Sequence, residues 1–408
     1  MLQLSEDSSF HFEAIRSLGI TRANGSDIGE TLAILDKIKP KDFEDWYREW
    51  HNLALRVQSS IDGSKSYSPV TLRDVYFRAS HYFYVADFYT HGSPEDPRGK
   101  ESYELWRKYF DMANAHLPIP GQHVTLDSGH GFKIPVILWR APQASATNPR
   151  PTLILGGGFD SCMEELYNTF GIPALERGYN VTIYEGPGQP TLLREQGVGF
   201  IHDWEKAVTP IVDYILAHKS DNLAFMDTTK VGLLGWSLGG YFAARAAAFE
   251  PRLAAVICID GVWDFGETFL QSFDGTGEAL EKRDIEAFNR CYETIPTSTS
   301  SQRRWIRDHM KYSFQQSSGH GIYQIVKKMT LEGIADKIKM PAFVAEAVAD
   351  QFFAGQPACV VAEIGANATL FKFDETHAAE THVHAGALTY LNQEIMEWYA
   401  GIVGDKHE

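Results

Sequence analysis

The sequence is short of cysteine, of basic residues and of long hydrophobic runs. Its 408 residues include four cysteines without a C-x-x-C spacing, so neither a disulfide framework nor a thiolate metal site is indicated. The formal net charge of −16 disfavours nucleic acids and acidic membrane surfaces as partners, because both are negatively charged. No segment approaches about 18 uncharged apolar residues, and the N-terminus lacks a basic stretch followed by an apolar one. We therefore expect a cytoplasmic protein without a nucleic-acid or membrane partner.

Hydrophobic residues are nevertheless plentiful. They make up 44% of the sequence and aromatic residues make up 12%, which is enough for a large packed interior. At 408 residues the chain exceeds the roughly 250 to 300 residues at which a single hydrophobic core stops growing. One large core with additional parts is expected.

Residues 1–118 have the pattern of a helical, lid-like domain. In the segment DFEDWYREWHNLALRV the apolar positions recur every three or four residues, which is the spacing of one buried helix face. Similar segments follow, separated by breaks rich in glycine, proline and serine.

From about residue 120 the pattern changes to short β-rich runs separated by helical stretches. Most of these runs are continuously apolar, as expected for parallel strands that are covered on both faces. The sequence therefore predicts an α/β core over residues 119–408 with a mostly parallel eight-stranded sheet, in the runs HVTLD, FKIPVILWR, PTLILGGG, NVTIYEG, KVGLLGW, AAVICID, PAFVAEA and ATLFKFD.

A long stretch without a strand separates the sixth and seventh of these runs. It is longer than a crossover helix requires, and its apolar positions again have helical spacing. We expect a helical cap inserted at about residues 266–335.

Ser237 is the predicted nucleophile. It stands in Gly235-Trp236-Ser237-Leu238-Gly239, a G-x-S-x-G motif between an apolar strand and an alanine-rich helix. This strand, tight turn and helix form a nucleophile elbow, in which small neighbours are needed because the serine backbone is strained.

With this motif in this setting, the chain resembles the α/β hydrolases. Within them it is similar to the group that contains dihydroxypseudooxynicotine hydrolase, the fungal polyketide-shortening hydrolases of pigment pathways and the FrsA-like esterases. The resemblance covers most of residues 40–400 and implies the α/β-hydrolase fold, with a homodimer as a further implication. It is carried by the segments LILGGGFDSCMEELY, YEGPGQP, HDWEKAVTPIVDYI, GWSLGG and AETHVHAGA.

In this fold an oxyanion is held by two backbone N–H groups. One belongs to the residue after the serine, here Leu238, and the other to the loop after an earlier strand, here Gly158 and Phe159. A close-packing turn is the alternative for this glycine-rich strand end.

Three further residues are candidates for the substrate pocket. Glu185 begins the EGPGQ loop, which should lie at the same edge of the sheet, and Trp236 precedes the serine. Tyr82 lies on the helical domain with other polar and aromatic residues, where packing between domains is the alternative.

A serine hydroxyl needs a neighbouring imidazole to accept its proton. The segment after the last strand offers His377, His382 and His384, and the resemblance favours His382 in its Glu-Thr-His context, with His384 next. A metal site in this cluster would need carboxylate or thiolate partners. The sequence holds no metal, nucleotide or flavin motif, so neither a metal nor a cofactor is predicted.

The predicted acid that orients the imidazole is Asp350, which follows the run PAFVAEA. The alternatives are Asp260 and Asp264, at the end of the preceding strand. Helix N-capping is the competing role for these carboxylates.

Together these residues predict a serine hydrolase that acts on a small-molecule carbonyl substrate through an acyl-enzyme. The resemblance implies carbon–carbon bond hydrolysis, a retro-Claisen cleavage of a β-diketone, aryl ketone or polyketide, in secondary metabolism or catabolism. A carboxylesterase or lactonase, an acyl transferase or cyclase of a polyketide pathway, and a non-catalytic binding protein remain as alternatives.

Overall fold

The computed structural model describes residues 2–90, 92–93, 95–294 and 301–405. Within them the chain builds one sheet of eight strands in the order β1-β2-β4-β3-β5-β6-β7-β8. The pairs β1–β2 and β2–β4 are antiparallel, and all other neighbours are parallel. The predicted mostly parallel sheet is therefore confirmed, with strands β1 (Gln122–Asp127), β2 (Lys133–Trp139), β3 (Arg150–Gly156), β4 (Asn180–Tyr184), β5 (Met226–Trp236), β6 (Ala255–Ile259), β7 (Ala342–Ala347) and β8 (Ala368–Phe373).

The central strands are buried on both faces, which explains their continuous apolar sequence. Neighbouring residues of β3 point to opposite sides, so Leu153 and Leu155 join one hydrophobic cluster and Ile154 joins another. The two clusters lie under different helices. The first cluster is covered by helices α6 (Met163–Leu166), α7 (Ile172–Glu176) and α16 (Leu388–Val403). The second cluster is covered by helices α8 (Glu205–Ala217), α9 (Gly239–Phe249) and α15 (Gln356–Ile364).

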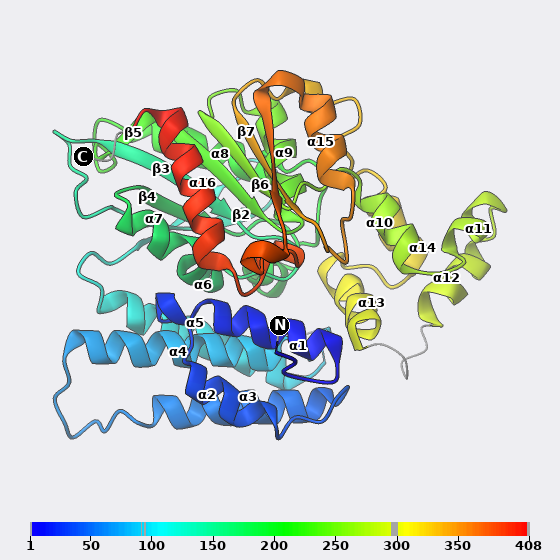
Figure 1. Cartoon of the computed structure of the whole chain (residues 1–408), viewed down its shortest axis with the longest axis horizontal. Helices are drawn as coiled ribbons and strands as arrows, with labels where there is room; N and C mark the ends of the chain where they lie inside the picture. The colour runs from blue at the N-terminus through cyan, green and yellow to red at the C-terminus, as the bar shows by residue number, and fades with distance from the viewer. Residues whose placement is uncertain (1, 91, 94, 295–300, 406–408) are drawn as a thin grey trace.

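The N-terminal segment forms a helical bundle beside the sheet (Figure 1). Trp46 and Trp50, on the face predicted to be buried, are both 0% exposed. The bundle consists of α1 (Ser8–Gly19), α2 (Ile28–Leu35), α3 (Phe43–Gln58), α4 (Pro69–Asp87) and α5 (Pro97–Ala115).

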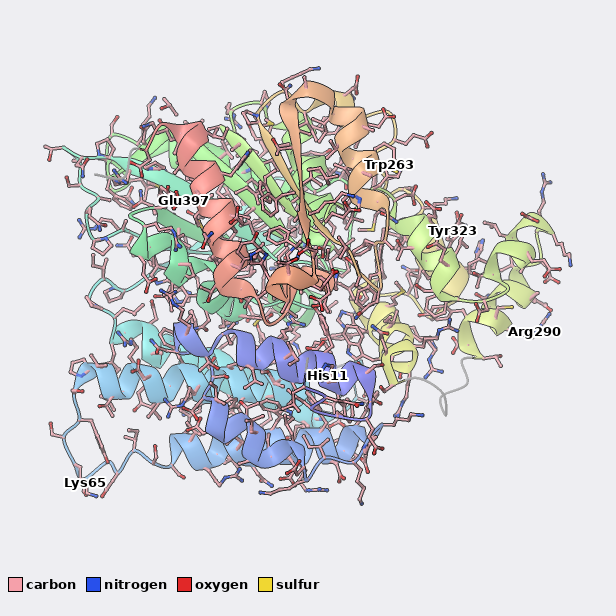
Figure 2. All side chains as sticks on the ribbon, in the orientation of Figure 1. His11, Lys65, Trp263, Arg290, Tyr323 and Glu397 are labelled. Carbon is pink, nitrogen blue, oxygen red and sulfur yellow. The ribbon has the colours of Figure 1, made fainter. Side chains whose placement is uncertain are left out.

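The bundle and the sheet share the first hydrophobic cluster. The ring of Phe110 on α5 meets the ring of Trp139 on β2 edge to face, with centroids 6.3 Å apart. In Figure 2 side chains fill the space between the bundle and the α/β core. The predicted boundary near residue 118 thus falls in the connection between α5 and β1, but the hydrophobic core continues across it.

Between β6 and β7 the chain forms a group of helices at one end of the sheet (Figure 1). They fall in the predicted cap at about residues 266–335, of which 295–300 lie outside the described residues. Trp305 of this cap stacks on Phe88, at 4.7 Å between ring centroids, and its Nε1 donates to Phe88 O at 2.8 Å. The cap consists of α10 (Phe265–Ser272), α11 (Thr276–Glu281), α12 (Ile285–Glu293), α13 (Ser301–Ser313) and α14 (Gly319–Val326).

None of the helices in the described ranges is both long enough and apolar enough to cross a membrane.

Candidate active site

Ser237 lies in a tight turn between β5 and α9. Its φ of +61° is a strained value for a residue with a side chain. The turn depends on the surrounding glycines: a Cβ on Gly235 would lie 1.8 Å from Gly239 O, and one on Gly240 would lie 1.9 Å from Asp260 O. The turn therefore raises the serine above the edge of the sheet only because these positions lack side chains.

His382 lies beside this serine. Its Nε2 is 2.9 Å from Ser237 Oγ, a hydrogen-bond distance, although the two residues are 145 positions apart. His382 begins the short turn η7 (His382–His384) after β8 and is 5% exposed. The rings of Phe352 and Phe353 pack against it, with centroids 4.7 and 5.6 Å from that of the imidazole.

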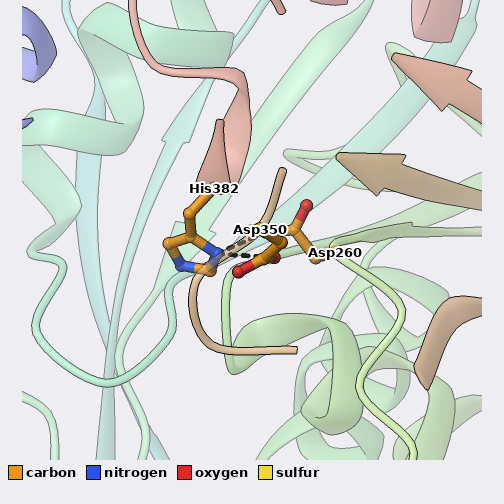
Figure 3. A group of neighbouring side chains, drawn as sticks. All are labelled: Asp260, Asp350 and His382. Carbon is orange, nitrogen blue, oxygen red and sulfur yellow. Dashed lines mark hydrogen bonds and ion pairs between the residues drawn. The ribbon is translucent and has the colours of Figure 1, made fainter. Parts of the chain in front are cut away.

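Two carboxylates reach the other nitrogen of this imidazole (Figure 3). Nδ1 of His382 is 3.0 Å from Asp350 Oδ2 and 2.8 Å from Asp260 Oδ2. Asp350 follows β7 and Asp260 follows β6, and the sequence offered them as alternatives. The structure brings both to the same atom.

Each carboxylate is also held by backbone donors. Asp350 Oδ1 accepts from Phe352 N at 2.7 Å and from Phe353 N at 3.2 Å. Asp260 Oδ2 accepts from Val383 N at 3.0 Å. Asp264, the third candidate, instead caps the N-terminus of α10, so its predicted alternative role is the one that the structure shows.

The two carboxylates control the charge of the imidazole. Burial alone would lower the pKa of His382, but the charges of Asp350 and Asp260 outweigh burial and raise this pKa to about 10. Burial would likewise raise the pKa of Asp260, but the neighbouring imidazole keeps it below its ordinary value. The two carboxylates thus stabilise the imidazolium form of His382.

The other two histidines of the segment lie in different surroundings. His384 is fully buried; its Nδ1 donates to Ala379 O at 2.9 Å, and its Nε2 is 3.7 Å from Asp260 Oδ1. His377 is exposed and stacks on Tyr390. Of the three, His382 is the one that contacts Ser237.

Asp260, Asp350 and His382 also place three potential metal-ligand atoms within 4.8 Å of one another. The separations of 2.8 and 3.0 Å between Nδ1 and the carboxylate oxygens are those of N–H···O hydrogen bonds. Ligand atoms around a tetrahedral zinc ion would be about 3.3 Å apart, from bond lengths near 2.0 to 2.1 Å. The geometry thus fits a shared proton better than a shared metal ion.

The predicted oxyanion donors lie around the serine turn. A Cβ on Gly158 would be 2.8 Å from Leu238 N and 3.0 Å from Ser237 Cβ, so glycine allows the end of β3 to approach the turn closely. The Gly158 N–H itself donates to Ser161 Oγ at 3.3 Å. Phe159, the next residue, lines the pocket above Ser237.

The EGPGQ loop supports this strand end. Gln189 Nε2 donates to Gly157 O at 2.8 Å and to Gly158 O at 3.1 Å, while its Oε1 accepts from Gly186 N at 2.7 Å. Gln189 is 1% exposed. The loop therefore holds the glycine-rich segment in place.

A largely apolar pocket opens above Ser237. Its wall is formed by α1, the turn after β3, the end of β5 with the serine turn, the cap helices α10 and α13, and the segments after β7 and β8. Trp236 belongs to the wall, and its role in binding a substrate stays a prediction. Its aromatic members are Phe12, Phe159, Trp236, Phe265, Phe269, Trp305, Phe352 and Phe353.

Two predicted pocket residues lie elsewhere and have structural contacts. Glu185 is buried, and its carboxylate accepts from Met163 N at 3.1 Å and from Thr191 N at 2.6 Å. The Tyr82 hydroxyl donates to Glu30 at 2.8 Å inside the bundle. Neither side chain lines the pocket, because the loop turns Glu185 toward α6 and α4 turns Tyr82 toward α2.

The contribution of α1 was missed in the sequence. Ser9, Phe12, Glu13 and Arg16 all line the pocket. Their spacing of three, four and seven residues places them on one helix face. The combination of aromatic and charged residues on one helix face was the available sign of a pocket wall. The neighbouring sequence does not indicate what this face covers.

A serine on a strand-to-helix elbow at the carboxyl edge of such a sheet defines the class of the protein: it is an α/β hydrolase. No family model matches the chain. It is 30% identical over 367 residues to Hydrolase acrC of Aspergillus aculeatus, covering 86% of this chain and 85% of that protein. It is also 30% identical over 353 residues to 20-hydroxy-prefusarin hydrolase FUS2 of Gibberella moniliformis, covering 84% and 83% of the two chains.

Among solved structures, that of 2,6-dihydroxy-pseudo-oxynicotine hydrolase matches with a TM-score of 0.68 and 20% identity, over 95% of this chain and 97% of that one. The resemblance seen in the sequence is thus confirmed. The chain belongs to the α/β-hydrolase family that includes acrC and FUS2, and it is a hydrolase.

Proposed function

We propose that this hydrolase is a serine enzyme in which Ser237 is the nucleophile and His382 is the general base. The observation that carries the proposal is the continuous hydrogen-bonded path from Ser237 Oγ through both nitrogens of His382 to the carboxylates of Asp350 and Asp260. Because both carboxylates accept at Nδ1, this nitrogen carries a proton, and Nε2 of the neutral imidazole is free to accept the proton of the serine.

In the first step Ser237 Oγ bonds to the substrate carbonyl carbon, and its proton passes to His382 Nε2. The carbonyl π electrons move to oxygen, which becomes an oxyanion. Leu238 N–H and Phe159 N–H are the proposed donors to it, because the Gly158 N–H is already used by Ser161. Asp350 and Asp260 stabilise the imidazolium formed at this stage.

In the second step the oxyanion collapses and the bond to the leaving group breaks. The leaving group departs with the bonding electron pair and takes the proton from His382 Nε2. Water then attacks the acyl-enzyme by the same sequence, which releases the carboxylic acid and restores Ser237.

We further propose that the bond broken is a carbon–carbon bond of a β-diketone, an aryl ketone or a polyketide-like compound. The aromatic wall suits a conjugated small molecule and shields the site from water, which would otherwise protonate a carbanion without control. FUS2, a relative of this chain, is named for an action on 20-hydroxy-prefusarin.

The test uses two probes that share one acyl group, 1-phenylbutane-1,3-dione and phenyl acetate. Purified enzyme should convert the diketone to acetophenone and acetate, both visible by mass spectrometry, and a fluorophosphonate should label Ser237. Rapid cleavage of phenyl acetate while the diketone stays intact would contradict carbon–carbon cleavage and support esterase activity instead. Labelling that is unchanged in Ser237→Ala would overturn the serine mechanism itself.

A further inference from the structure

The wall that α1 contributes to the pocket contains a buried charged cluster. The ring of Phe12 lies 6.2 Å from that of His382, and the Arg16 guanidinium lies over the ring of Trp236 at 5.1 Å. Trp236 directly precedes Ser237. The helix therefore passes across the reacting centre, and Glu13, one turn before Arg16, faces the same pocket.

Arg16 is surrounded by carboxyl groups. Its Nε and Nη2 each donate to Glu165 at 2.6 Å, and its Nη1 lies 3.3 Å from both Glu13 Oε2 and Asp160 Oδ2. The Arg16 and Glu165 side chains are 8% and 1% exposed. One guanidinium thus faces three carboxyl groups, and its strongest contacts are with Glu165 and not with the pocket.

Glu13 is the carboxyl group of this cluster that lines the pocket and has a raised pKa; burial also raises the pKa of Glu165 behind it. Burial, followed by the negative charges of Asp160 and Glu165, outweighs the nearby Arg16 and raises the pKa of Glu13 to about 8. The side chain is 10% exposed. Near pH 7 it is therefore predominantly a neutral carboxylic acid, which can donate a hydrogen bond as well as accept one.

We propose that Glu13 is a specificity-determining residue that donates a hydrogen bond to an uncharged oxygen of the substrate, at a distance from the reacting carbonyl. The proposal rests on the proposed function, because it takes Ser237 as the reacting end of the pocket. It stands on the position of Glu13 in the pocket wall, on its burial and on the occupation of Arg16 by Glu165.

The cluster also defines the chemical class of the substrate. Three carboxyl groups, those of Glu13, Asp160 and Glu165, already surround the single guanidinium of Arg16. A carboxylate on the substrate would therefore find no free cation in this cluster to pair with. A keto or hydroxyl oxygen on an otherwise apolar chain fits both the neutral donor and the aromatic wall.

Glu13 and the groups around it define the expected pH dependence. They are Arg16 on the same helix, Asp160 after β3, Glu165 on α6, and the phenols of Tyr84 and Tyr89, whose pKa values are raised by burial. As pH rises through about 8, Glu13 loses its proton, the donated hydrogen bond is lost, and KM for an oxygenated substrate should rise.

The experiment uses 4-nitrophenyl octanoate and its 3-oxo, 5-oxo and 7-oxo derivatives as matched probes. For the derivative whose keto oxygen reaches Glu13, the wild-type enzyme should show a lower KM than for octanoate, by about tenfold, the upper range of one hydrogen bond. Glu13→Leu should abolish this KM ratio, while Glu13→Gln, which keeps an N–H donor, should retain it. The mono-4-nitrophenyl ester of octanedioic acid should bind worst.

The pH dependence of KM distinguishes a hydrogen bond donated by Glu13 from a packing effect of its side chain. The KM advantage of the oxo ester should decline above pH 8 in the wild type and stay level in Glu13→Gln; Glu6→Gln, an exposed carboxylate just before α1, should follow the wild type. Equal KM changes for octanoate and all oxo esters in Glu13→Leu would overturn the proposal. Fluorophosphonate labelling of Ser237 in every variant distinguishes this result from failure of the serine mechanism.

Discussion

The floor and the roof of the active-site pocket are built in different ways. The floor consists of turns at the ends of β5, β6, β7 and β8, which carry the four residues of the proposed catalytic site, and backbone N–H groups hold the two carboxylates among them. The roof consists of α1 and the cap helices, which are positioned by aromatic packing such as that of Trp305 on Phe88. Under the proposed function, the floor determines the chemistry, whereas the roof determines which substrate reaches it.

Replacing the nucleophile should have the largest effect. Ser237→Ala removes the attacking oxygen and should lower kcat on the order of 10⁴- to 10⁶-fold, because the remaining groups cannot form an acyl-enzyme. Steady-state rates and mass spectrometry of the trapped acyl-enzyme measure this loss. The thermal unfolding midpoint should stay near that of the wild type, and a kcat within tenfold of wild type would exclude Ser237 as the nucleophile.

The second test compares the two carboxylates at His382. Asp350→Asn and Asp260→Asn should each leave considerable activity, because the other carboxylate still accepts from Nδ1. The double variant should lose about 10⁴-fold in kcat, as when a triad carboxylate is lost. If either single variant were as inactive as the double variant, the two carboxylates would not share this role.

The same variants should shift the pH profile. The base must be neutral to accept the serine proton, so kcat/KM should rise with pH through the raised pKa of His382, about 10 in the free enzyme. Removing either carboxylate removes a charge that raises this pKa, so the rise should move to lower pH. A profile that moved to higher pH would contradict the assigned charges.

A smaller loss is expected at the end of β3. The Cβ of Gly158→Ala would lie 2.6 Å from Trp236 O and 2.8 Å from Leu238 N, so the turn that carries the proposed oxyanion donors must shift. We expect kcat to fall about 10²- to 10³-fold, the loss typical of one oxyanion donor. Gly129→Ala is a control, since that glycine has open space around its Cβ position, although its positive φ adds some strain. Retained kcat in Gly158→Ala would argue against this oxyanion site.

The smallest effect is expected in the roof. Asp7 caps α1 and its carboxylate also accepts from Ser301 Oγ of α13 at 2.5 Å, so it links the bundle to the cap. Asp7→Ala should cost about 1 kcal/mol of unfolding free energy, typical of a lost N-cap, and should also raise KM. Asp42→Ala removes the N-cap of α3 away from the pocket, so only stability should fall, as measured by denaturant unfolding. Equal KM values in both variants would show that the roof does not depend on this link.

Much of the floor could be predicted from local sequence. The G-W-S-L-G motif specifies much of its own turn, because the two nearest atoms that exclude a side chain at Gly235 belong to Gly239 of the same motif. The strand runs, the helical bundle and the inserted helices follow from hydrophobic spacing. The serine elbow and the fold class were therefore accessible from the amino-acid sequence by itself.

The tertiary structure decided which distant segments of the chain come into contact. Asp260 and Asp350 looked like alternatives because each follows a strand, and only the neighbouring positions of β6 and β7 bring both to Nδ1 of His382. Glu185 and Tyr82 have polar groups suited to a pocket, but hydrogen bonds to their own surroundings turn them away from it. The role of the pocket face of α1 depends on contacts with residues more than 140 positions away along the chain, such as that between Arg16 and Glu165. A local pattern can specify a turn or a helix face, whereas the partner of that face depends on the packing of the whole chain.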